Sequence, residues 1–252
     1  MKQYVRKAYR GIKYLVINPK YFFSYFFGKP ESVLQGLTGQ SYDRYLTLRD
    51  QLTSGSNFFE ELRERTSQFA NEQFEISIDH YFLYALVRIT QPKRILETGV
   101  FDGYFTACIL KGLEDNLQHD GVAGRCISID LPAYTSIKGS TDEMARSHLP
   151  QSCDVGWVIP EYLRKHWELY LGDSRELLPK VTKKVGDISL FFHDSLHTYD
   201  HMKMEYETVW PLLQKGAFLL SHDIHWNRAF KEFVQQYNQK EWTMHGFGIV
   251  QK

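Results

Sequence analysis

The chain has 252 residues, which is enough for one sizeable domain with additions or for two small domains. Its 30 lysines and arginines balance its 30 aspartates and glutamates, so no global charge favours nucleic acid as a partner. The three cysteines, Cys108, Cys126 and Cys153, show neither metal-ligand spacing nor a plausible disulfide framework. This composition favours a reducing, intracellular setting.

Residues 1–30 contain seven Lys or Arg and no acidic residue, with aromatic side chains between them. Lys13, Asn18-Pro19 and Lys20 interrupt every apolar run well short of the roughly 18 residues of a transmembrane helix. No apolar core with a small-residue cleavage site marks a signal peptide. Two interpretations remain open: an arm that packs on the main domain or on a second copy in a homodimer, or a segment at a membrane surface. The expected location is the cytoplasm, with peripheral membrane contact under the second interpretation.

Three helices are predicted before the first strand, over residues 42–52, 58–69 and about 79–90. The breaks around them contain glycine or proline, at 28–30, 36–39 and 91–92. Asp79 is the predicted cap of the third helix. We predict an N-terminal basic arm and helical cap over residues 1–75 and an α/β domain over residues 76–252.

The chain is organised around residues 94–103, Arg-Ile-Leu-Glu-Thr-Gly-Val-Phe-Asp-Gly. This pattern predicts a strand, a tight turn and a helix over 104–114, the opening unit of a doubly wound α/β sheet. Gly99 lets the backbone approach a ligand because it has no Cβ, and the following helix offers N–H groups to an anionic group. A tight turn without a ligand is the alternative interpretation.

Further strands are predicted over 126–130, 167–171, 188–192 and 217–220, with helices over 199–213 and 227–239 and a hairpin over 242–251 that turns at 246–248. The 199–213 helix is expected to stop at Lys215-Gly216. Five strands end at or just before an acidic residue, namely Glu97, Asp130, Asp173, Asp194 and Asp223. Since ligands bind beyond the carboxyl ends of strands in an open α/β sheet, these carboxylates are expected along one edge.

Two of these acids have the positions of nucleoside-binding residues. Asp130 ends the second strand, where a carboxylate can accept hydrogen bonds from both hydroxyls of a ribose. Asp173 and Ser174 follow the third strand and could bind the edge of a nucleobase. The alternative for Asp130 is a helix-capping or solvent-facing side chain, and for Asp173 with Ser174 it is a helix cap.

Asp194, His197, His222 and Asp223 form a second group after two neighbouring strands. Asp194 and Asp223 could reach one divalent ion; oxygen ligands favour Mg²⁺, whereas His222 would admit a transition metal. His197 could act as a general base beside that ion, which would lower the pKa of a bound hydroxyl. Ordinary loop histidines are the alternative.

These residues together resemble the class I S-adenosylmethionine-dependent methyltransferases. The resemblance is to the metal-dependent O-methyltransferase group with macrocin-type and cephalosporin-hydroxylase-like members, and more distantly to catechol O-methyltransferase. It covers about residues 76–250 and rests on residues 97–103, 128–130, 155–174, 193–199 and 219–223.

The resemblance implies a role for each candidate residue. Glu97, Gly99 and Gly103 would hold the methionine part of S-adenosylmethionine, Asp130 its ribose, and Asp173 with Ser174 its adenine. Asp194, His222 and Asp223 would occupy metal-ligand positions, although relatives often have a carboxylate where His222 stands. His197 matches a base position, and residues 131–154 match a substrate lid.

The expected fold is therefore a Rossmann-like doubly wound α/β sheet, mostly parallel with a C-terminal antiparallel hairpin, plus an N-terminal helical cap. The expected activity is Mg²⁺-assisted methyl transfer from S-adenosylmethionine to a hydroxyl of a small molecule or sugar, with His197 as base. The alternatives are a metal-independent methyltransferase of the same fold and a non-enzymatic protein that docks on a membrane or a partner.

Overall fold

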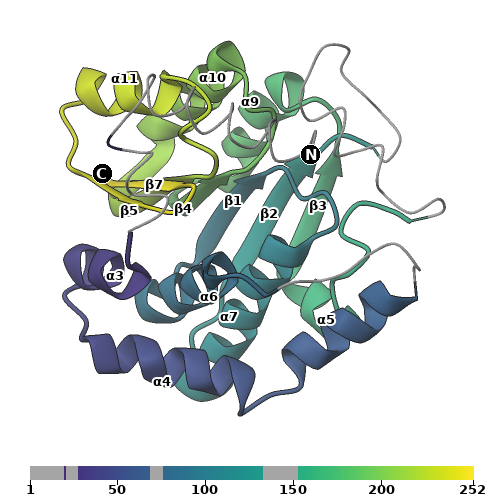
Figure 1. Cartoon of the computed structure of the whole chain (residues 1–252). Coiled ribbons are helices and arrows are strands. Elements are labelled where there is room, and N and C mark those ends of the chain that lie inside the picture. Colours follow the sequence, from purple (N-terminus) through teal and green to yellow (C-terminus); the bar gives the residue numbers. More distant parts are fainter. Residues whose placement is uncertain (1–19, 21–27, 69–75, 133–152) are drawn as a thin grey trace, which may run out of the picture.

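A computed structural model describes residues 20, 28–68, 76–132 and 153–252 (Figure 1). Most of the basic arm and of the predicted lid lies outside these residues. The centre is a seven-stranded sheet in the order β3-β2-β1-β4-β5-β7-β6. Its strands are β1 (Arg94–Thr98), β2 (Arg125–Asp130), β3 (Trp167–Leu171), β4 (Ile188–His193), β5 (Leu213–Ser221), β6 (Glu241–Met244) and β7 (Phe247–Gln251).

The first five strands are parallel to one another, and β7 runs antiparallel to both β5 and β6. This is the mostly parallel sheet with a C-terminal antiparallel hairpin that the sequence predicts. The strand order reverses between β1 and β4, and in such sheets ligands bind beyond the carboxyl ends of the strands at this point.

Helices cover both faces of the sheet (Figure 1). One side holds α3 (Pro30–Thr38), α4 (Tyr42–Thr53), α5 (Phe58–Ser67), α6 (Ile78–Thr90) and α7 (Tyr104–Asp120). The other holds α9 (Ser174–Val185), α10 (Tyr199–Val209) and α11 (Ala229–Gln236). Two 3₁₀ turns, Glu161–His166 and Trp210–Leu212, precede β3 and β5.

Each face of the sheet has its own apolar core. Leu34 of α3, Leu48 of α4 and Phe82 of α6 belong to the first core, together with residues of the central strands. Tyr206 of α10 and Phe230 of α11 belong to the second. The described part of the helical cap therefore shares its core with α6 and α7. The predicted division at residue 75 falls within 69–75, outside the described residues.

Three local predictions are wrong, and for the first and the third the structure shows the contact that overrides the local signal. Ser77 rather than Asp79 precedes α6, and its backbone N–H donates to His80 Nδ1 at 3.0 Å. Helix α10 ends at Val209, and residues 215–216 lie within β5. Helix α3 includes Gly36, where a Cβ would lie 2.7 Å from the Trp242 indole nitrogen, so glycine here allows close packing on β6.

Within the described ranges, no helix is both long and apolar enough to cross a membrane.

Candidate functional site

The glycine turn joins β1 to α7 and packs directly on the loop that follows β4. Gly99 has a φ of 86°, and a Cβ at this position would lie 2.1 Å from the carbonyl oxygen of Asp194. Gly103 has a φ of 98°, and its Cβ would lie 2.9 Å from atoms of Gly156 and Ile159. The sequence predicts that these glycines admit a ligand; the structure shows that they also admit the protein's own chain.

Glu97 is fully buried beneath this turn. Each of its carboxyl oxygens lies 3.0 Å from the Thr106 hydroxyl oxygen, and Oε2 lies 2.5 Å from the Ser128 hydroxyl oxygen. Burial raises the pKa of Glu97 to about 8, although both hydroxyls act in the opposite direction. These contacts join β1, β2 and α7, and contact between Glu97 and a cofactor stays a prediction.

Asp130 ends β2 and holds the glycine turn in place. Its Oδ2 accepts hydrogen bonds from the backbone N–H groups of Val100, at 3.0 Å, and Phe101, at 2.8 Å. Its Oδ1 accepts one from the N–H of Leu131 at 2.7 Å. The predicted ribose-binding carboxylate and the predicted methionine-binding turn therefore form one unit.

Asp173 and Ser174 begin α9, but their side chains have different surroundings. Asp173 accepts a hydrogen bond from the backbone N–H of Arg175 at 2.9 Å and pairs with its guanidinium, and the hydrogen bonds lower the pKa of Asp173. The Ser174 hydroxyl is buried and donates to Glu205 at 2.5 Å. The helix-capping alternative thus describes the present contacts of Asp173, and the contact of both residues with adenine stays a prediction.

The second predicted group meets where β4 and β5 end. Asp194 Oδ1 lies 3.0 Å from His222 Nδ1 and 3.5 Å from His197 Nε2. One ligand atom from each of these three residues lies within 4.8 Å of the others, so they could reach a common ion. Asp223 lies beside them but outside this set, with its Oδ2 4.0 Å from His222 Nδ1.

The charges in this group stabilise one another. Burial would raise the pKa of Asp194, but His222 and His197 hold it well below its usual range. Burial would also lower the pKa of His222, but the carboxylates of Asp223 and Asp194 raise it to about 9. At neutral pH, Asp194 and His222 therefore form an aspartate–imidazolium pair.

Aromatic rings from two other elements pack against the ring of His222. The Phe105 ring at the start of α7 lies 5.4 Å from it, and the Phe247 ring of β7 lies 5.0 Å from it, between ring centroids. A Cβ on Gly246 would approach His222 Nε2 to 3.0 Å. Asp223 has a φ of 52°, a left-handed conformation that aspartate adopts more readily than most residues. His222 is thus fixed by its neighbours on both sides.

Two carboxylates near the site were not assigned to it from the sequence. Asp79 of α6 lies 3.8 Å from His245 Nδ1, and burial raises its pKa. Glu205 of α10 is fully buried and contacts residues in three of the predicted site loops. A signal for Glu205 does exist, because it lies on the apolar stripe of its helix beside Met202 and Tyr206.

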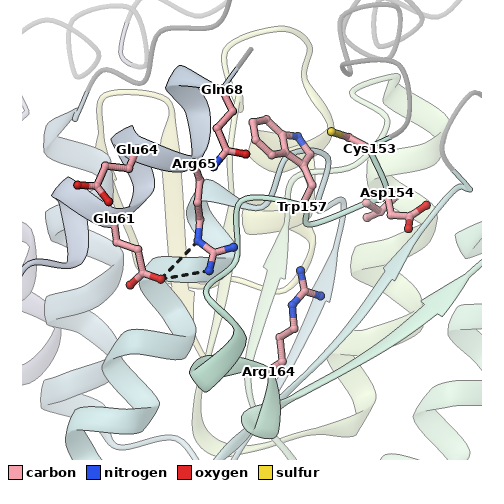
Figure 2. Close-up of a pocket in the computed structure, with 9 residues that line it drawn as sticks. Glu61, Glu64, Arg65, Gln68, Cys153, Asp154, Trp157 and Arg164 are labelled. Carbon is pink, nitrogen blue, oxygen red and sulfur yellow. Dashed lines mark hydrogen bonds and ion pairs between the residues drawn. The ribbon is translucent and has the colours of Figure 1, made fainter.

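A polar groove of about 740 Å³ lies between α5 and the segment before β3 (Figure 2). Glu61 and Arg65 of α5 form an ion pair at 3.2 Å on one wall. Trp157 lies on the other wall and donates its indole N–H to Asp102 of the glycine turn at 2.6 Å. The groove therefore borders the turn, but none of the predicted site residues lines it.

Solved methyltransferase structures have the same fold. The O-methyltransferase from Bacillus cereus in complex with SAH is 15% identical with a TM-score of 0.52, and the match covers 82% of this chain and 96% of that chain. The SAH-bound Podospora anserina methyltransferase PaMTH1 is 15% identical with a TM-score of 0.52, covering 83% and 94%. The O-methyltransferase NovP is 17% identical with a TM-score of 0.53, covering 83% and 98%. The fold is that of the class I S-adenosylmethionine-dependent methyltransferases, as predicted.

The amino-acid sequence identifies the family independently of the fold. The profile of a family described as a methyltransferase domain matches residues 96–224, just over half of the chain. The chain belongs to this methyltransferase family. A search of the curated proteins finds no significant match.

Proposed function

We propose that this methyltransferase transfers the methyl group of S-adenosylmethionine to a hydroxyl of a small molecule, with His197 as general base. The observation that supports this most directly is the contact between the two predicted half-sites. The Asp194 backbone N–H donates to the Thr98 carbonyl at 2.8 Å, beside Gly99, while its side chain faces His197. The loop that carries the candidate base is therefore hydrogen-bonded to the end of β1, directly before the candidate cofactor turn.

The residues at the carboxyl ends of β1 and β2 fit a nucleoside cofactor. Asp130 and the turn that it holds lie at the carboxyl ends of the strands, beside the point where the strand order reverses. When bound, S-adenosylmethionine supplies a methyl group on a positively charged sulfur. In this proposal Asp130 binds the ribose hydroxyls, and the glycine turn orients the methionine part toward the Asp194 side.

The acceptor hydroxyl needs orientation and the removal of its proton. His197 takes that proton as the acceptor oxygen bonds to the methyl carbon, and the electron pair of the broken bond stays on sulfur. Asp194, 3.5 Å from His197 Nε2, stabilises the resulting imidazolium. A positioned base typically contributes about 10²–10⁴-fold in rate, and holding the reactants in line contributes a further large factor.

The donors present fit the predicted Mg²⁺ poorly. Mg²⁺ prefers oxygen ligands, but the set within reach of one point has two imidazoles, His197 and His222, and one carboxylate. His222 must also lose its proton before it can bind any metal. A transition metal suits such a set better. We therefore assign no step to a metal, and the metal-independent alternative gains support from the Asp194–His222 pair.

Three finer predictions remain with this proposal. A cytoplasmic location, a homodimer and a peripheral membrane contact through residues 1–30 rest on sequence alone. Within that segment the structure describes Lys20, which pairs with Glu241 of β6, and residues 28–30. Liposome binding by the full chain that disappears after deletion of residues 1–27 would support the membrane contact.

The first test is thermal unfolding with S-adenosylhomocysteine, for the natural chain and for Asp130→Ala. A ligand at 100 times its Kd adds about 2.7 kcal/mol of stability. We expect a clear upward shift that Asp130→Ala removes. The same scan with EDTA, Mg²⁺ and Mn²⁺ tests the metal. No shift with S-adenosylhomocysteine under any of these conditions would refute the proposed cofactor.

A further inference from the structure

Glu205 is a fully buried acidic residue on α10 with several hydrogen-bond donors around it. Its Oε2 accepts hydrogen bonds from the Thr98 hydroxyl at 2.5 Å and from His193 Nδ1 at 2.7 Å. Its Oε1 accepts them from Ser174 at 2.5 Å, His201 Nε2 at 2.9 Å and Ser195 at 3.0 Å. Since an ionised carboxylate only accepts, both histidines must direct an N–H toward it.

The pKa of Glu205 agrees with this arrangement. Burial would raise it, but the hydrogen bonds from His193 and His201 outweigh burial and hold it well below its usual range. Burial lowers the pKa of His193 more than Glu205 raises it. Glu205 is thus an anion held by five side chains.

Three of the five donors come from the segments that carry the predicted site residues, whereas His193 ends β4 and His201 lies on α10 itself. Thr98 immediately precedes Gly99 of the glycine turn. Ser174 follows Asp173 at the start of α9. Ser195 follows Asp194 in the loop that leads to His197. One carboxylate therefore connects the cofactor turn, the predicted adenine loop and the loop of the candidate base.

A simple packing role does not require a charge at this position. The other buried residues of α10 are Met202, Tyr206 and Val209, which are apolar or aromatic, and His201, which donates to Glu205. Replacement of a buried charged group by an apolar group of similar volume is often neutral or stabilising. An apolar residue could not accept hydrogen bonds from three loops at once.

We infer that Glu205 is a positioning residue that fixes the glycine turn, the β3–α9 loop and the β4–α10 loop relative to one another. The inference rests on the proposed function, because it assumes that these loops bind the cofactor and present the base. In this inference Glu205 itself does not contact the substrate. Its expected effect is on cofactor affinity, because two of the three loops are predicted to bind S-adenosylmethionine.

The test measures the Kd of S-adenosylhomocysteine by calorimetry at 15 °C for the full chain and its variants. Glu205→Gln puts an N–H₂ group where the carboxylate accepted hydrogen bonds, and we expect its Kd to rise at least tenfold. Glu207→Gln, on the same helix but partly exposed and paired only loosely with Lys203 at 3.8 Å, is the matched control and should stay within twofold.

A second control separates positioning from stability. Val209→Ala removes buried apolar contacts from the same helix, so it should lower the unfolding temperature without changing the Kd. If Glu205→Gln lowers the unfolding temperature as Val209→Ala does, but leaves the Kd within twofold, Glu205 is structural only and the inference is wrong.

Two milder substitutions test the inference if Glu205→Gln does not fold. Thr98→Val and Ser174→Ala each remove one neutral donor to Glu205 from a different cofactor loop. We expect each to raise the Kd at least threefold, and an unchanged Kd in both would overturn the inference. If the natural chain itself does not bind S-adenosylhomocysteine, the proposed function fails first, which is distinguishable from normal binding that the variants leave unaltered.

Discussion

The two halves of the candidate site are built differently. At the ends of β1 and β2, Glu97 is held by hydroxyl groups and Asp130 by backbone N–H groups. At the ends of β4 and β5, Asp194 faces two histidines, and the side chains of Asp194 and His222 are about one-fifth exposed. The first half is stabilised by neutral partners and the second by opposite charges.

This difference suggests that one half of the site sets its geometry and that the other half sets its protonation state. Neutral hydrogen bonds and close backbone contacts fix the geometry of the first half below the pKa of Glu97, which is about 8. The second half depends on which of its groups carry protons, since Asp194 and His222 shift each other's pKa values. We therefore expect substitutions in the first half to change stability and cofactor binding, and substitutions in the second to change turnover and pH dependence.

The largest effect is expected from Gly99→Ala. A Cβ there would lie 2.1 Å from the Asp194 carbonyl oxygen, so the contact between the two halves would break or the chain would not fold. We expect a loss of at least about 3 kcal/mol in the free energy of unfolding. Gly121→Ala is the control: it also has a positive φ, but no other group lies within 4 Å of its Cβ, so about 1 kcal/mol is expected. Similar losses in urea unfolding for both variants would contradict the close contact.

His197→Ala should reduce methyl transfer strongly while leaving the first half intact. We expect turnover with any active hydroxyl acceptor to fall at least about 100-fold, because the acceptor proton loses its base. The Kd of S-adenosylhomocysteine should stay within twofold. Undiminished turnover would show that another group takes the proton, and lost cofactor binding would show that the halves are not separable.

Glu97→Gln tests the buried carboxyl of the first half. Its folded pKa of about 8 lies above the unfolded value, so it stabilises the protein least at high pH, and stability falls as pH rises from about 4.5 to 8. Glutamine keeps the size and removes this loss. We expect Glu97→Gln to be more stable than the natural chain by about 1–3 kcal/mol at pH 8.5, with a smaller difference at pH 5. A variant that is less stable at pH 8.5 would show that the Glu97 carboxylate is stabilised by its partners and that its pKa is not raised.

The last of these effects concerns His222. Its folded pKa of about 9 lies above the unfolded value, so its stabilisation is complete below about pH 6.5 and is lost as pH rises through 9. Compared with His222→Asn, the natural chain should lose about 1–3 kcal/mol of stability between pH 6 and pH 9.5. Direct NMR titration of the ring checks the pKa, and a value near 6.5 would remove the proposed aspartate–imidazolium pair.

Local pattern was sufficient for the sheet and for the edge at which the acids gather. Strands alternate with helices along the chain, and each acidic residue stands at or just after the end of its strand in the sequence. Parallel strands then bring these residues to one edge of the sheet. It was not sufficient for side-chain partners. Asp173 pairs with Arg175, a neighbour two residues away, and Glu205 gathers donors from strands and loops far along the chain.

The same limit applies to the helical cap. The glycines at 36 and 39 indicate a break, yet α3 continues through Gly36 because the flat face left by glycine accommodates Trp242. No local rule connects these two residues. Some contacts that override local preference are themselves local, such as Asp173 with Arg175, but those of Gly36 with Trp242 and of Glu205 with Thr98 join segments distant in sequence.

The fit of α3 against β6 has a consequence for synthesis of the protein in the cell. The helix leaves the ribosome about 200 residues before the strand that contains Trp242. At ordinary rates of translation the delay is on the order of ten seconds or more. During that interval the apolar side chains of Val33, Leu34 and Leu37 lack one of the surfaces that bury them. The nascent chain is therefore expected to be a client of cotranslational chaperones until its last hairpin emerges.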